Sequence, residues 1–197
     1  HRYIRRQRQM CIRDSCHSDL HVQKGYMDLG EEGRLTFAER GAQLPMTFGH
    51  EIAGFVEAVG DKVKNVSIGQ QVLVFPWIGC GDCLACNEDR ESDCSAMRII
   101  GLKQKGGFAT HCLIENEKFL VNIDGLDATE VVPHACSGIT VYNALEKIGF
   151  LRDGEWLAVM GCGGLGLNAI AIAGAMGFDN IIGIDIDNSK LDAAHEM

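Results

Sequence analysis

Four closely spaced cysteines constrain this chain more than any other feature. They follow the pattern C-x2-C-x2-C-x7-C within GCGDCLACNEDRESDC, at Cys80, Cys83, Cys86 and Cys94. A zinc ion binds four thiolates tetrahedrally, and short loops between the cysteines can bring the four sulfur atoms together. A chance cluster or a pair of disulfide bonds is the alternative. The spacing predicts a structural zinc lobe at residues 80–94.

The two ends of the chain differ from the rest. Residues 1–15 contain five arginines and no apolar period. A basic arm for nucleic acid and an Arg-rich targeting peptide are two interpretations. We favour a third, in which RRQRQMCIRDS is the translation of a sequencing adapter and the natural sequence begins near Ser15 or Cys16. The other end, LDAAHEM, stops within a helical pattern without a cap, so we expect truncation at both ends.

The charge of the chain argues against polyanionic partners. The formal net charge is −9 even with the five arginines of residues 1–15, and a field of this sign repels nucleic acid and anionic membranes. No apolar run reaches the ~18 residues of a membrane span. Cysteines with metal-ligand spacing, and no secretory signal, favour the reducing cytoplasm. We therefore expect no nucleic-acid partner, no membrane partner and a cytoplasmic location.

The apolar pattern divides the chain into two parts, which its length and 46% apolar content can support. Up to about Val121, short apolar segments are separated by glycines and predict an antiparallel, barrel-like domain. The strands are expected at residues 52–60, 71–75, 108–114 and 119–121. After Pro133 the pattern predicts helices and buried parallel strands, which make one βαβ unit. Its elements are expected at residues 137–149, 156–160, 163–177 and 180–185.

A glycine motif follows the first of these later strands. Gly161, Gly163 and Gly166 form G-x-G-x-x-G, with Gly164 between them at the start of the expected helix. Such glycines allow a tight turn, the approach of a pyrophosphate and close helix packing. Asp185 ends the next strand, where a carboxylate binds the adenosine ribose and favours NAD over NADP. Glycines of a plain turn and an N-cap role for Asp185 are the alternatives.

Three further motifs, taken with the cysteine lobe and the βαβ unit, carry a family resemblance. They are CHSDLH at residues 16–21, GHE at residues 49–51 and HACSGITVY at residues 134–142. Over residues 16–197 the chain resembles the zinc-containing medium-chain alcohol dehydrogenases. The resemblance implies an α+β chain of two domains. Residues 16–135 would form a GroES-like catalytic domain with an antiparallel β-barrel, and residues 136–197 the first part of a Rossmann NAD-binding domain.

The resemblance also implies a second zinc ion, which is catalytic. Its ligands match Cys16, His50 and Cys136, which leave a fourth position open. Glu51 matches an acidic residue behind the metal that exchanges as a ligand, and Asp19 matches a carboxylate that orients the ligating histidine. For Cys136 the alternative is a small buried apolar residue. Two zinc ions per chain are thus expected.

Further site residues follow from the same resemblance. Ser18 and His21 match a relay that carries the proton of the alcohol to solvent. His17, Thr140 and Lys190 match contacts to the cofactor phosphate, the nicotinamide and the adenosine ribose. His21 and Lys190 can instead be read as solvated surface residues. Cys112 is expected in the core, and Cys162, within the glycine turn, has no assigned role.

The implied activity is hydride transfer between a primary alcohol and NAD. The segment from Lys24 to Glu51 resembles a subgroup typified by 6-hydroxyhexanoate dehydrogenase, which implies an ω-hydroxy acid as substrate. A secondary-alcohol or polyol dehydrogenase of the same family is one alternative, and a non-enzymatic zinc-binding module is another. The family forms homo-oligomers, so the full-length protein is expected to do so. We expect the chain of 197 residues alone to lack turnover.

Overall fold

The computed structural model describes residues 16–149 and 151–197, and the interpretation of residues 1–15 falls outside that part. The contacts divide the chain after Ala135 into two compact units, and each is described by itself. Within the described residues, no helix combines the length and the apolar character that a membrane crossing requires.

The first unit is built of short strands and short helical segments. Along the chain they are α1 (Ser18–Lys24), β1 (Tyr26–Asp28), η1 (Gly30–Glu32), β2 (Arg34–Thr36), β3 (Ile52–Phe55), β4 (Gln71–Val74), β5 (Trp77–Ile78), α2 (Leu84–Asn87), η2 (Glu91–Asp93), β6 (Arg98–Ile99), η3 (Glu117–Phe119), β7 (Leu120–Asn122), α3 (Ala128–Val131) and η4 (Val132–Ala135).

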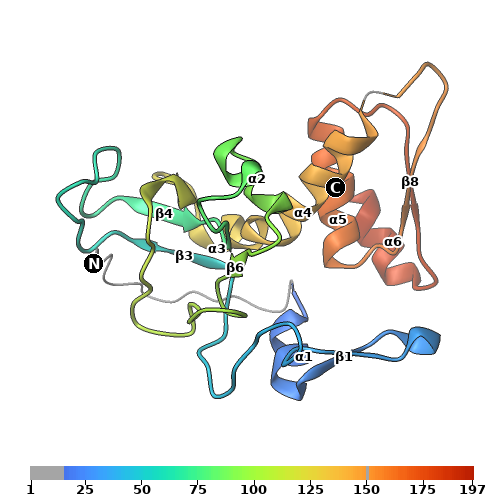
Figure 1. Ribbon diagram of the computed structural model, residues 1–197. Coiled ribbons are helices and arrows are strands. Elements are labelled where there is room, and N and C mark those ends of the chain that lie inside the picture. Colours follow the sequence, from blue (N-terminus) through green and yellow to red (C-terminus); the bar gives the residue numbers. More distant parts are fainter. Residues whose placement is uncertain (1–15, 150) are drawn as a thin grey trace. The chain divides into compact units, whose positions relative to one another are not determined.

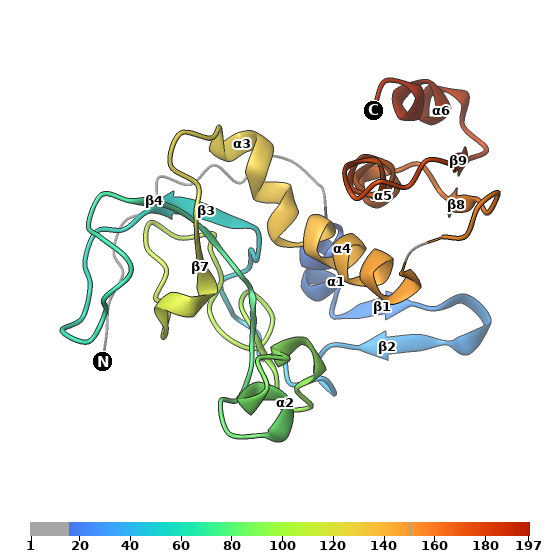
Figure 2. The same cartoon turned by 90° about the horizontal axis from the view of Figure 1, so that it is seen from above.

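The first unit contains a three-stranded antiparallel sheet in the order β3-β4-β7, of which β3 and β4 are labelled in Figure 1 and all three strands in Figure 2. Ile52 pairs with Val74, and Ala53 pairs with Leu73. Because successive side chains of a strand point to opposite faces, each pair belongs to a different face. The first pair joins a core with Ile78, Ile100, Ile114 and Phe119, and the second joins a core with Ile123, Val132 and Ala135. At these two pairs, each face of the sheet therefore packs on a core of its own.

The expected strand at residues 108–114 does not form, and this prediction is wrong. The backbone N–H groups of Gly106, Gly107 and Phe108 donate to the carbonyl oxygens of Thr47, Gly49 and Phe48. The chain then turns, since Ala109 N–H bonds to Gly107 O. The backbone thus bonds to the loop before His50 rather than to a neighbouring strand. The other three expected strands correspond to β3 and β4, which are shorter than expected, and to β7, which is shifted by one residue.

A hairpin follows α1 and supports its position. β1 and β2 lie side by side and antiparallel in Figure 2, with Tyr26 opposite Thr36. Val22 of α1 packs with Phe37 and Ala42 into a small core. Gly25 ends α1 with a φ of 84°, a left-handed conformation that glycine adopts readily. This local core holds α1, and with it the CHSDLH motif, against the hairpin.

The second unit contains the predicted βαβ unit, which is confirmed. Its elements are α4 (Ser137–Ile148), β8 (Leu157–Met160), α5 (Gly164–Ala175), β9 (Ile181–Ile184) and α6 (Asn188–His195). β8 and β9 pair in parallel, with Leu157 opposite Ile181 and Met160 opposite Ile184. Val141, Leu145, Leu157 and Ala173 form a core that packs α4 and α5 together with the sheet. In Figure 2, α5 lies beside the two strands.

Candidate metal centre and dinucleotide site

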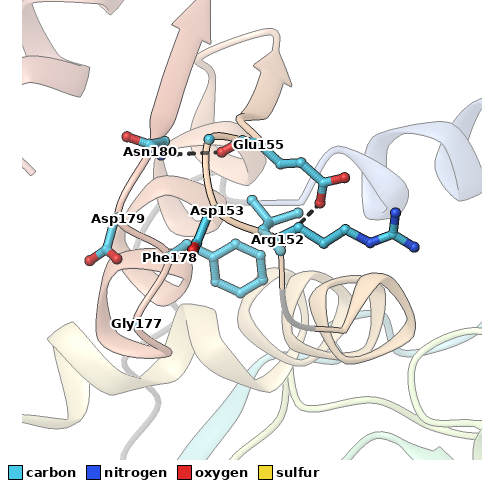
Figure 3. A pocket seen from close by; sticks show the side chains of 9 residues that line it. Arg152, Asp153, Glu155, Gly177, Phe178, Asp179 and Asn180 are labelled. Atoms are coloured by element: carbon cyan, nitrogen blue, oxygen red, sulfur yellow. Dashed lines mark hydrogen bonds between the residues drawn. The ribbon is translucent and has the colours of Figure 1, made fainter.

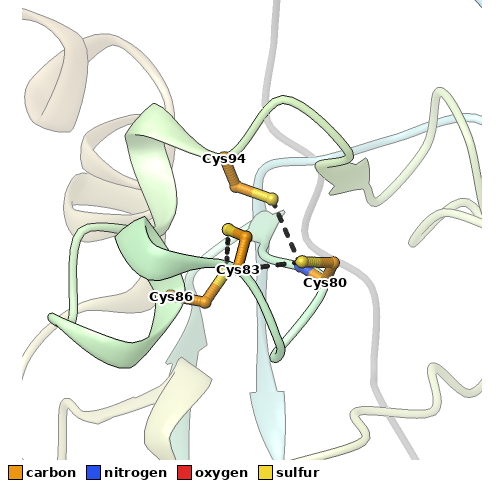
Figure 4. A group of neighbouring side chains, drawn as sticks. All are labelled: Cys80, Cys83, Cys86 and Cys94. Atoms are coloured by element: carbon orange, nitrogen blue, oxygen red, sulfur yellow. Dashed lines mark hydrogen bonds between the residues drawn. The ribbon is translucent and has the colours of Figure 1, made fainter.

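The four cysteines of the lobe lie together as free thiols (Figure 4). Their sulfur atoms are all within 4.8 Å of one another. The Sγ atoms of Cys83 and Cys86 are 3.5 Å apart, and those of Cys80 and Cys86 are 3.9 Å apart. A disulfide bond needs about 2.05 Å, whereas sulfurs that surround a zinc ion at about 2.3 Å lie about 3.8 Å apart. The geometry fits a tetrahedral metal and excludes the alternative of disulfide bonds in this lobe.

The surroundings of the lobe shift the pKa values of its thiols in opposite directions. Backbone N–H groups of Asp82 and Cys83 lower the pKa of the Cys80 thiol to about 6. The Gly81 backbone lowers the pKa of the Cys86 thiol, but burial and the neighbouring cysteines outweigh that contact and raise it. Lys118, which lies outside the lobe in the sequence, forms an ion pair with Glu91 of η2. That contact raises the pKa of the Lys118 ammonium. Gly79 has no room for a side chain, because a Cβ atom there would lie 2.5 Å from Cys86 Sγ. The lobe is thus packed closely against β5, the strand that precedes it.

A second group of possible ligands consists of Cys16, His50 and Cys136. Their ligand atoms lie within 4.8 Å of one another, and the described residues contain no further such group besides the cysteine lobe. Cys16 precedes the N-cap residue of α1, His50 lies two residues before β3, and Cys136 is the N-cap residue of α4. His50 and Cys136 are buried. Two thiols and an imidazole are a donor set that suits zinc with an open fourth position.

Asp19 contacts both His50 and the backbone before it. Its Oδ2 atom lies 3.6 Å from Nδ1 of His50, and its Oδ1 atom accepts the Gly49 N–H at 3.1 Å. Burial lowers the pKa of His50, but the Asp19 carboxylate and the Cys16 sulfur outweigh burial and raise it to about 10. A metal at this site must therefore displace a firmly held proton from His50.

Glycines allow a second loop to pack against the segment that carries His50. A Cβ atom on Gly106 would lie 2.3 Å from the Phe48 carbonyl oxygen, and one on Gly101 would lie 2.7 Å from the Gly49 carbonyl oxygen. Gly49 itself has a φ of 93°, in the left-handed region that favours glycine. Only residues without a side chain permit this approach. The double glycine at residues 106–107 is the one sequence signal that could have indicated it.

The proposed relay residues lie on α1, near the second group. The Cys16 thiol donates to the Ser18 hydroxyl over 3.0 Å. His21 follows Ser18 by one helical turn, so their side chains share a face of α1, and His21 is half-buried. His17 is the exposed N-cap residue of this helix. Glu51 is half-buried beside His50 in the chain, but it is not a member of the group, and its role as an exchanging ligand stays a prediction.

The glycine motif forms the turn between β8 and α5. Gly161 has a φ of 92°, and Gly163 is the N-cap residue of α5, which begins at Gly164. A Cβ atom on Gly166 would lie 1.9 Å from the Gly161 carbonyl oxygen, so any side chain there would displace the turn. The first backbone N–H groups of α5 have no partner within the helix and can bind an anion. This geometry is compatible with the predicted anion-binding turn, and the dinucleotide role of its glycines stays a prediction.

Asp185 is held close to this turn. Its Oδ2 atom accepts the Cys162 N–H at 2.8 Å, its Oδ1 atom accepts the Asp187 N–H at 2.9 Å, and Lys190 Nζ lies 3.7 Å away. The N–H groups of Asp187 and Cys162 hold the pKa of the Asp185 carboxyl below its usual range. Asp187, not Asp185, caps α6, because its side chain accepts the Ser189 N–H. The N-cap alternative for Asp185 is therefore wrong.

Two polar residues of the second unit, one buried and one half-buried, were missed by sequence reasoning. Asn168 of α5 donates from Nδ2 to the Ser137 hydroxyl of α4 over 2.6 Å. Ser137 directly follows Cys136 and is 1% exposed. Thr140, the expected nicotinamide contact, is exposed one turn further along α4. Nothing in the residue pattern relates Asn168 to Ser137, since they belong to different elements.

A pocket of about 210 Å³ lies between the loops that lead into β8 and β9 (Figure 3). Two hydrogen bonds hold it, from Arg152 N–H to the Glu155 carboxylate and from the Asn180 amide to Glu155 O. These loops precede the strands, whereas open α/β sheets bind ligands outside the carboxyl ends of their strands. The glycine turn lies at that other end of β8. The pocket is therefore separate from the dinucleotide site.

The chain is similar to a family of known proteins. Residues 13–125 match the family described as Alcohol dehydrogenase GroES-like domain. The NAD-dependent alcohol dehydrogenase of Sulfurisphaera tokodaii is 41% identical over 181 residues, which are 91% of this chain and 50% of the relative. The chain thus spans about half the length of this relative.

Solved structures show the same fold. The alcohol dehydrogenase of Aeropyrum pernix matches with a TM-score of 0.79 and 30% identity, over 92% of this chain and 51% of that chain. The D-arabinose dehydrogenase of Sulfolobus solfataricus matches with a TM-score of 0.76 and 30% identity, over 92% of this chain and 54% of that chain. The predicted fold class is confirmed. With its GroES-like domain at residues 13–125, the chain belongs to the zinc-type medium-chain alcohol dehydrogenase family.

Proposed function

We propose that this protein is an NAD-dependent zinc alcohol dehydrogenase that transfers hydride between a primary alcohol and NAD. One observation carries the proposal: Cys16, His50 and Cys136 bring three ligand atoms within 4.8 Å of one another, apart from the four-cysteine lobe. A purely structural zinc module needs only the lobe. A second group of ligands with an open fourth position is what a catalytic metal requires.

The donor set of this group fits zinc, and the fit supports the proposed role. Zinc bound there supplies Lewis acidity, which makes the proton of an alcohol easier to remove. Asp19 holds the ring of His50 through Nδ1 and thereby leaves the other ring nitrogen as the ligand. Burial of His50 and Cys136 excludes water, which strengthens the electrostatic contacts of the site.

Ser18 and His21 are proposed to move the proton of the alcohol. The Ser18 hydroxyl accepts from the Cys16 thiol in the metal-free chain, so it lies next to the first ligand. A metal-bound Cys16 has no proton to donate, and the hydroxyl is then available to a substrate. His21 shares a face of α1 with Ser18 and is partly exposed, which suits a group that passes a proton to solvent.

The second unit is proposed to bind NAD. The glycine turn presents the N-terminus of α5 to the pyrophosphate, and Asp185 accepts the adenosine ribose hydroxyls. Lys190, 3.7 Å from Asp185, is placed to contact the same ribose. His17 and Thr140 are proposed to contact the phosphate and the nicotinamide. The negative charge of Asp185 disfavours a 2′-phosphate, which is the basis for NAD over NADP.

The substrate class is proposed from the sequence of the segment between Lys24 and Glu51, which resembles the 6-hydroxyhexanoate dehydrogenase subgroup. We therefore propose the terminal alcohol of an ω-hydroxy acid. The match to a D-arabinose dehydrogenase at 30% identity supports a polyol or sugar as the second candidate. Both substrates share the hydride chemistry and differ in the groups beyond the reacting carbon.

A cytoplasmic location and a homo-oligomer complete the proposal. Eight cysteines of the described residues are free thiols, a state that the reducing cytoplasm preserves. Met160, Ile182 and Ile184 are exposed on one face of the β8-β9 sheet, and protein contacts would bury such a face. Sedimentation of the whole protein tests the oligomer.

Metal content and substrate oxidation test the proposal together. We expect two zinc ions per chain, and one in the Cys16→Ser and Cys136→Ser variants. NAD reduction is then measured with matched primary alcohols, ω-hydroxy acids, secondary alcohols and polyols. An unchanged zinc content in both variants, with no NAD binding, would favour the non-enzymatic zinc module. Activity that is confined to polyols would favour the second candidate.

A further inference from the structure

A partly buried hydrogen bond links the helix that begins at the second metal group to the helix that begins at the glycine turn. Asn168 Nδ2 donates to Ser137 Oγ over 2.6 Å. Ser137 is the first residue of α4, whose N-cap residue is the ligand candidate Cys136. Asn168 lies in the second turn of α5, whose N-cap residue is Gly163 of the glycine motif. One hydrogen bond therefore connects α4, which begins at the second metal group, to α5, which begins at the glycine turn.

The rest of the contact between these helices is apolar. Val141 and Leu145 of α4 pack with Ala169 and Ala173 of α5. Placing a hydroxyl and an amide in such a contact removes the Ser137 hydroxyl and part of the Asn168 side chain from water, and their hydrogen bond offsets that cost. Two apolar side chains would fill the space without the cost. What the polar pair adds is direction, because a hydrogen bond weakens steeply when its donor and acceptor are displaced.

The same bond fixes Cys136 relative to the glycine turn. Cys136 is one peptide bond from Ser137, and the turn is held to α5 by the close packing of Gly166 on the Gly161 carbonyl oxygen. A small displacement of α5 when an anion binds at its N-terminus would therefore move Ser137, and with it the Cys136 thiolate. Such a contact can couple anion binding at the N-terminus of α5 to metal binding at Cys136.

We propose that the hydrogen bond between Asn168 and Ser137 is a positioning contact that couples occupancy of the dinucleotide turn to the metal ligand Cys136. The inference rests on the proposed function, because it requires both a metal at the second group and a dinucleotide at the turn. In this proposal Asn168 and Ser137 act through the helices that they join, and not by contact with the metal or the dinucleotide.

The experiment uses the whole chain loaded with cobalt in both sites, with ADP-ribose as the probe. ADP-ribose has the adenosine and the pyrophosphate of NAD but no nicotinamide, so it cannot touch the metal. The visible cobalt–thiolate absorption reports on Cys136, and calorimetry reports on ADP-ribose binding. We expect ADP-ribose to shift the absorption of the second site. We also expect its affinity to change about five-fold or more when that site is emptied, since coupling is reciprocal.

Two variants and one control separate coupling from folding. Asn168→Ala removes the hydrogen bond. The double variant Ser137→Ala with Asn168→Leu also removes it, but it fills the space between α4 and α5 with apolar side chains. Asn143→Ala makes the same change as Asn168→Ala at an exposed position of α4. We expect each protein without the bond to bind two cobalt ions and ADP-ribose. The absorption shift should be reduced, and the reciprocal change in ADP-ribose affinity should fall below about two-fold. The control should retain both.

The outcomes distinguish this inference from the proposed function. Two bound cobalt ions and bound ADP-ribose without any shift in the unmodified chain would overturn the inference alone. So would a full shift that persists in the double variant. A chain that binds one cobalt ion, or no ADP-ribose, would overturn the proposed function and this inference together.

Discussion

The Oδ2 atom of Asp19 lies 3.6 Å from Nδ1 of His50, while its Oδ1 atom accepts the backbone N–H of Gly49 at 3.1 Å. One carboxylate thus holds both the imidazole ring and the peptide that precedes it. Because α1 carries Asp19 and the loop before β3 carries His50, this contact joins two segments distant in the sequence. The ring orientation of His50, and with it the second metal group, depends on that carboxylate.

Asp19→Asn should therefore weaken the second metal site and spare the first. The amide keeps the shape of the side chain but loses the negative charge that orients and polarises the His50 ring. Loss of such a supporting contact typically lowers metal affinity about 10–100-fold. Competition with a chelator measures the two sites separately. The matched control is Asp61→Asn, an exposed carboxylate in a turn, which should leave both affinities unchanged. Equal weakening in the two variants would contradict a specific role for Asp19.

The raised pKa of His50, about 10, predicts how metal binding depends on pH. Between about pH 6 and about pH 8 the metal-free ring keeps its proton, so each bound metal ion must release it. Affinity at the second group should then rise at least about ten-fold per pH unit. In Asp19→Asn the pKa of His50 falls, and the slope should decrease within this range. A slope that is identical in both proteins would show that His50 does not exchange a proton for the metal.

The raised pKa of His50 also predicts that the stability of the metal-free chain falls as the pH rises, whereas metal affinity increases. The pKa of His50 is higher in the folded chain, about 10, than its ordinary value of 6.5. The stabilisation is therefore fully present below pH 6.5 and is lost as the pH rises through about 10. Urea unfolding of metal-free protein should show this loss, and the His50→Gln variant should not. A metal-free chain as stable at about pH 10 as at about pH 6 would contradict the assignment.

Local patterns predicted the parts of the fold whose contacts are local. The cysteine spacing indicated the lobe because short loops suffice to gather four sulfur atoms, and the glycine spacing indicated the turn before α5 for the same reason. Cys16, His50 and Cys136 lie far apart in the sequence, so only the family resemblance suggested them. Their approach depends on the packing of α1, β3 and η4, which no residue pattern encodes.

The strand that was wrongly predicted and the helix contact that was missed also have physical causes. Residues 108–114 have the composition of a strand, but Gly106 and Gly107 let the backbone bond to the loop at residues 47–49 instead. The bond between Asn168 and Ser137 is a tertiary contact between two helices, and neither helix sequence taken singly indicates it. Side-chain pairs of this kind become visible only when the packing of the elements is known.

Gly166→Ala should disrupt the glycine turn, and Gly174→Ala provides a matched control on the same helix. The new Cβ atom at residue 166 would lie 1.9 Å from the Gly161 carbonyl oxygen, whereas residue 174 has no neighbouring atom within 4 Å. Overpacking of this kind costs about 1–3 kcal/mol, while alanine for glycine in an open helical position gains up to about 1 kcal/mol. Calorimetry with ADP-ribose should show binding lost in the first variant and retained in the second. Binding retained by Gly166→Ala would contradict the proposed dinucleotide turn.

Removal of one lobe cysteine should unfold the lobe and leave the second metal group in place. Cys86 is buried among the other three sulfur atoms, so Cys86→Ser should reduce the zinc content from two ions to one. Loss of a structural metal belongs to the most damaging class of changes, and we expect a loss of unfolding free energy on the order of 4 kcal/mol. Cys112→Ser is the control, because burial raises the pKa of the Cys112 thiol to about 11 and it belongs to neither ligand group. That variant should keep both zinc ions and most of the stability. If Cys86→Ser bound two zinc ions as tightly as the unmodified chain, the four-cysteine lobe would not be a metal site.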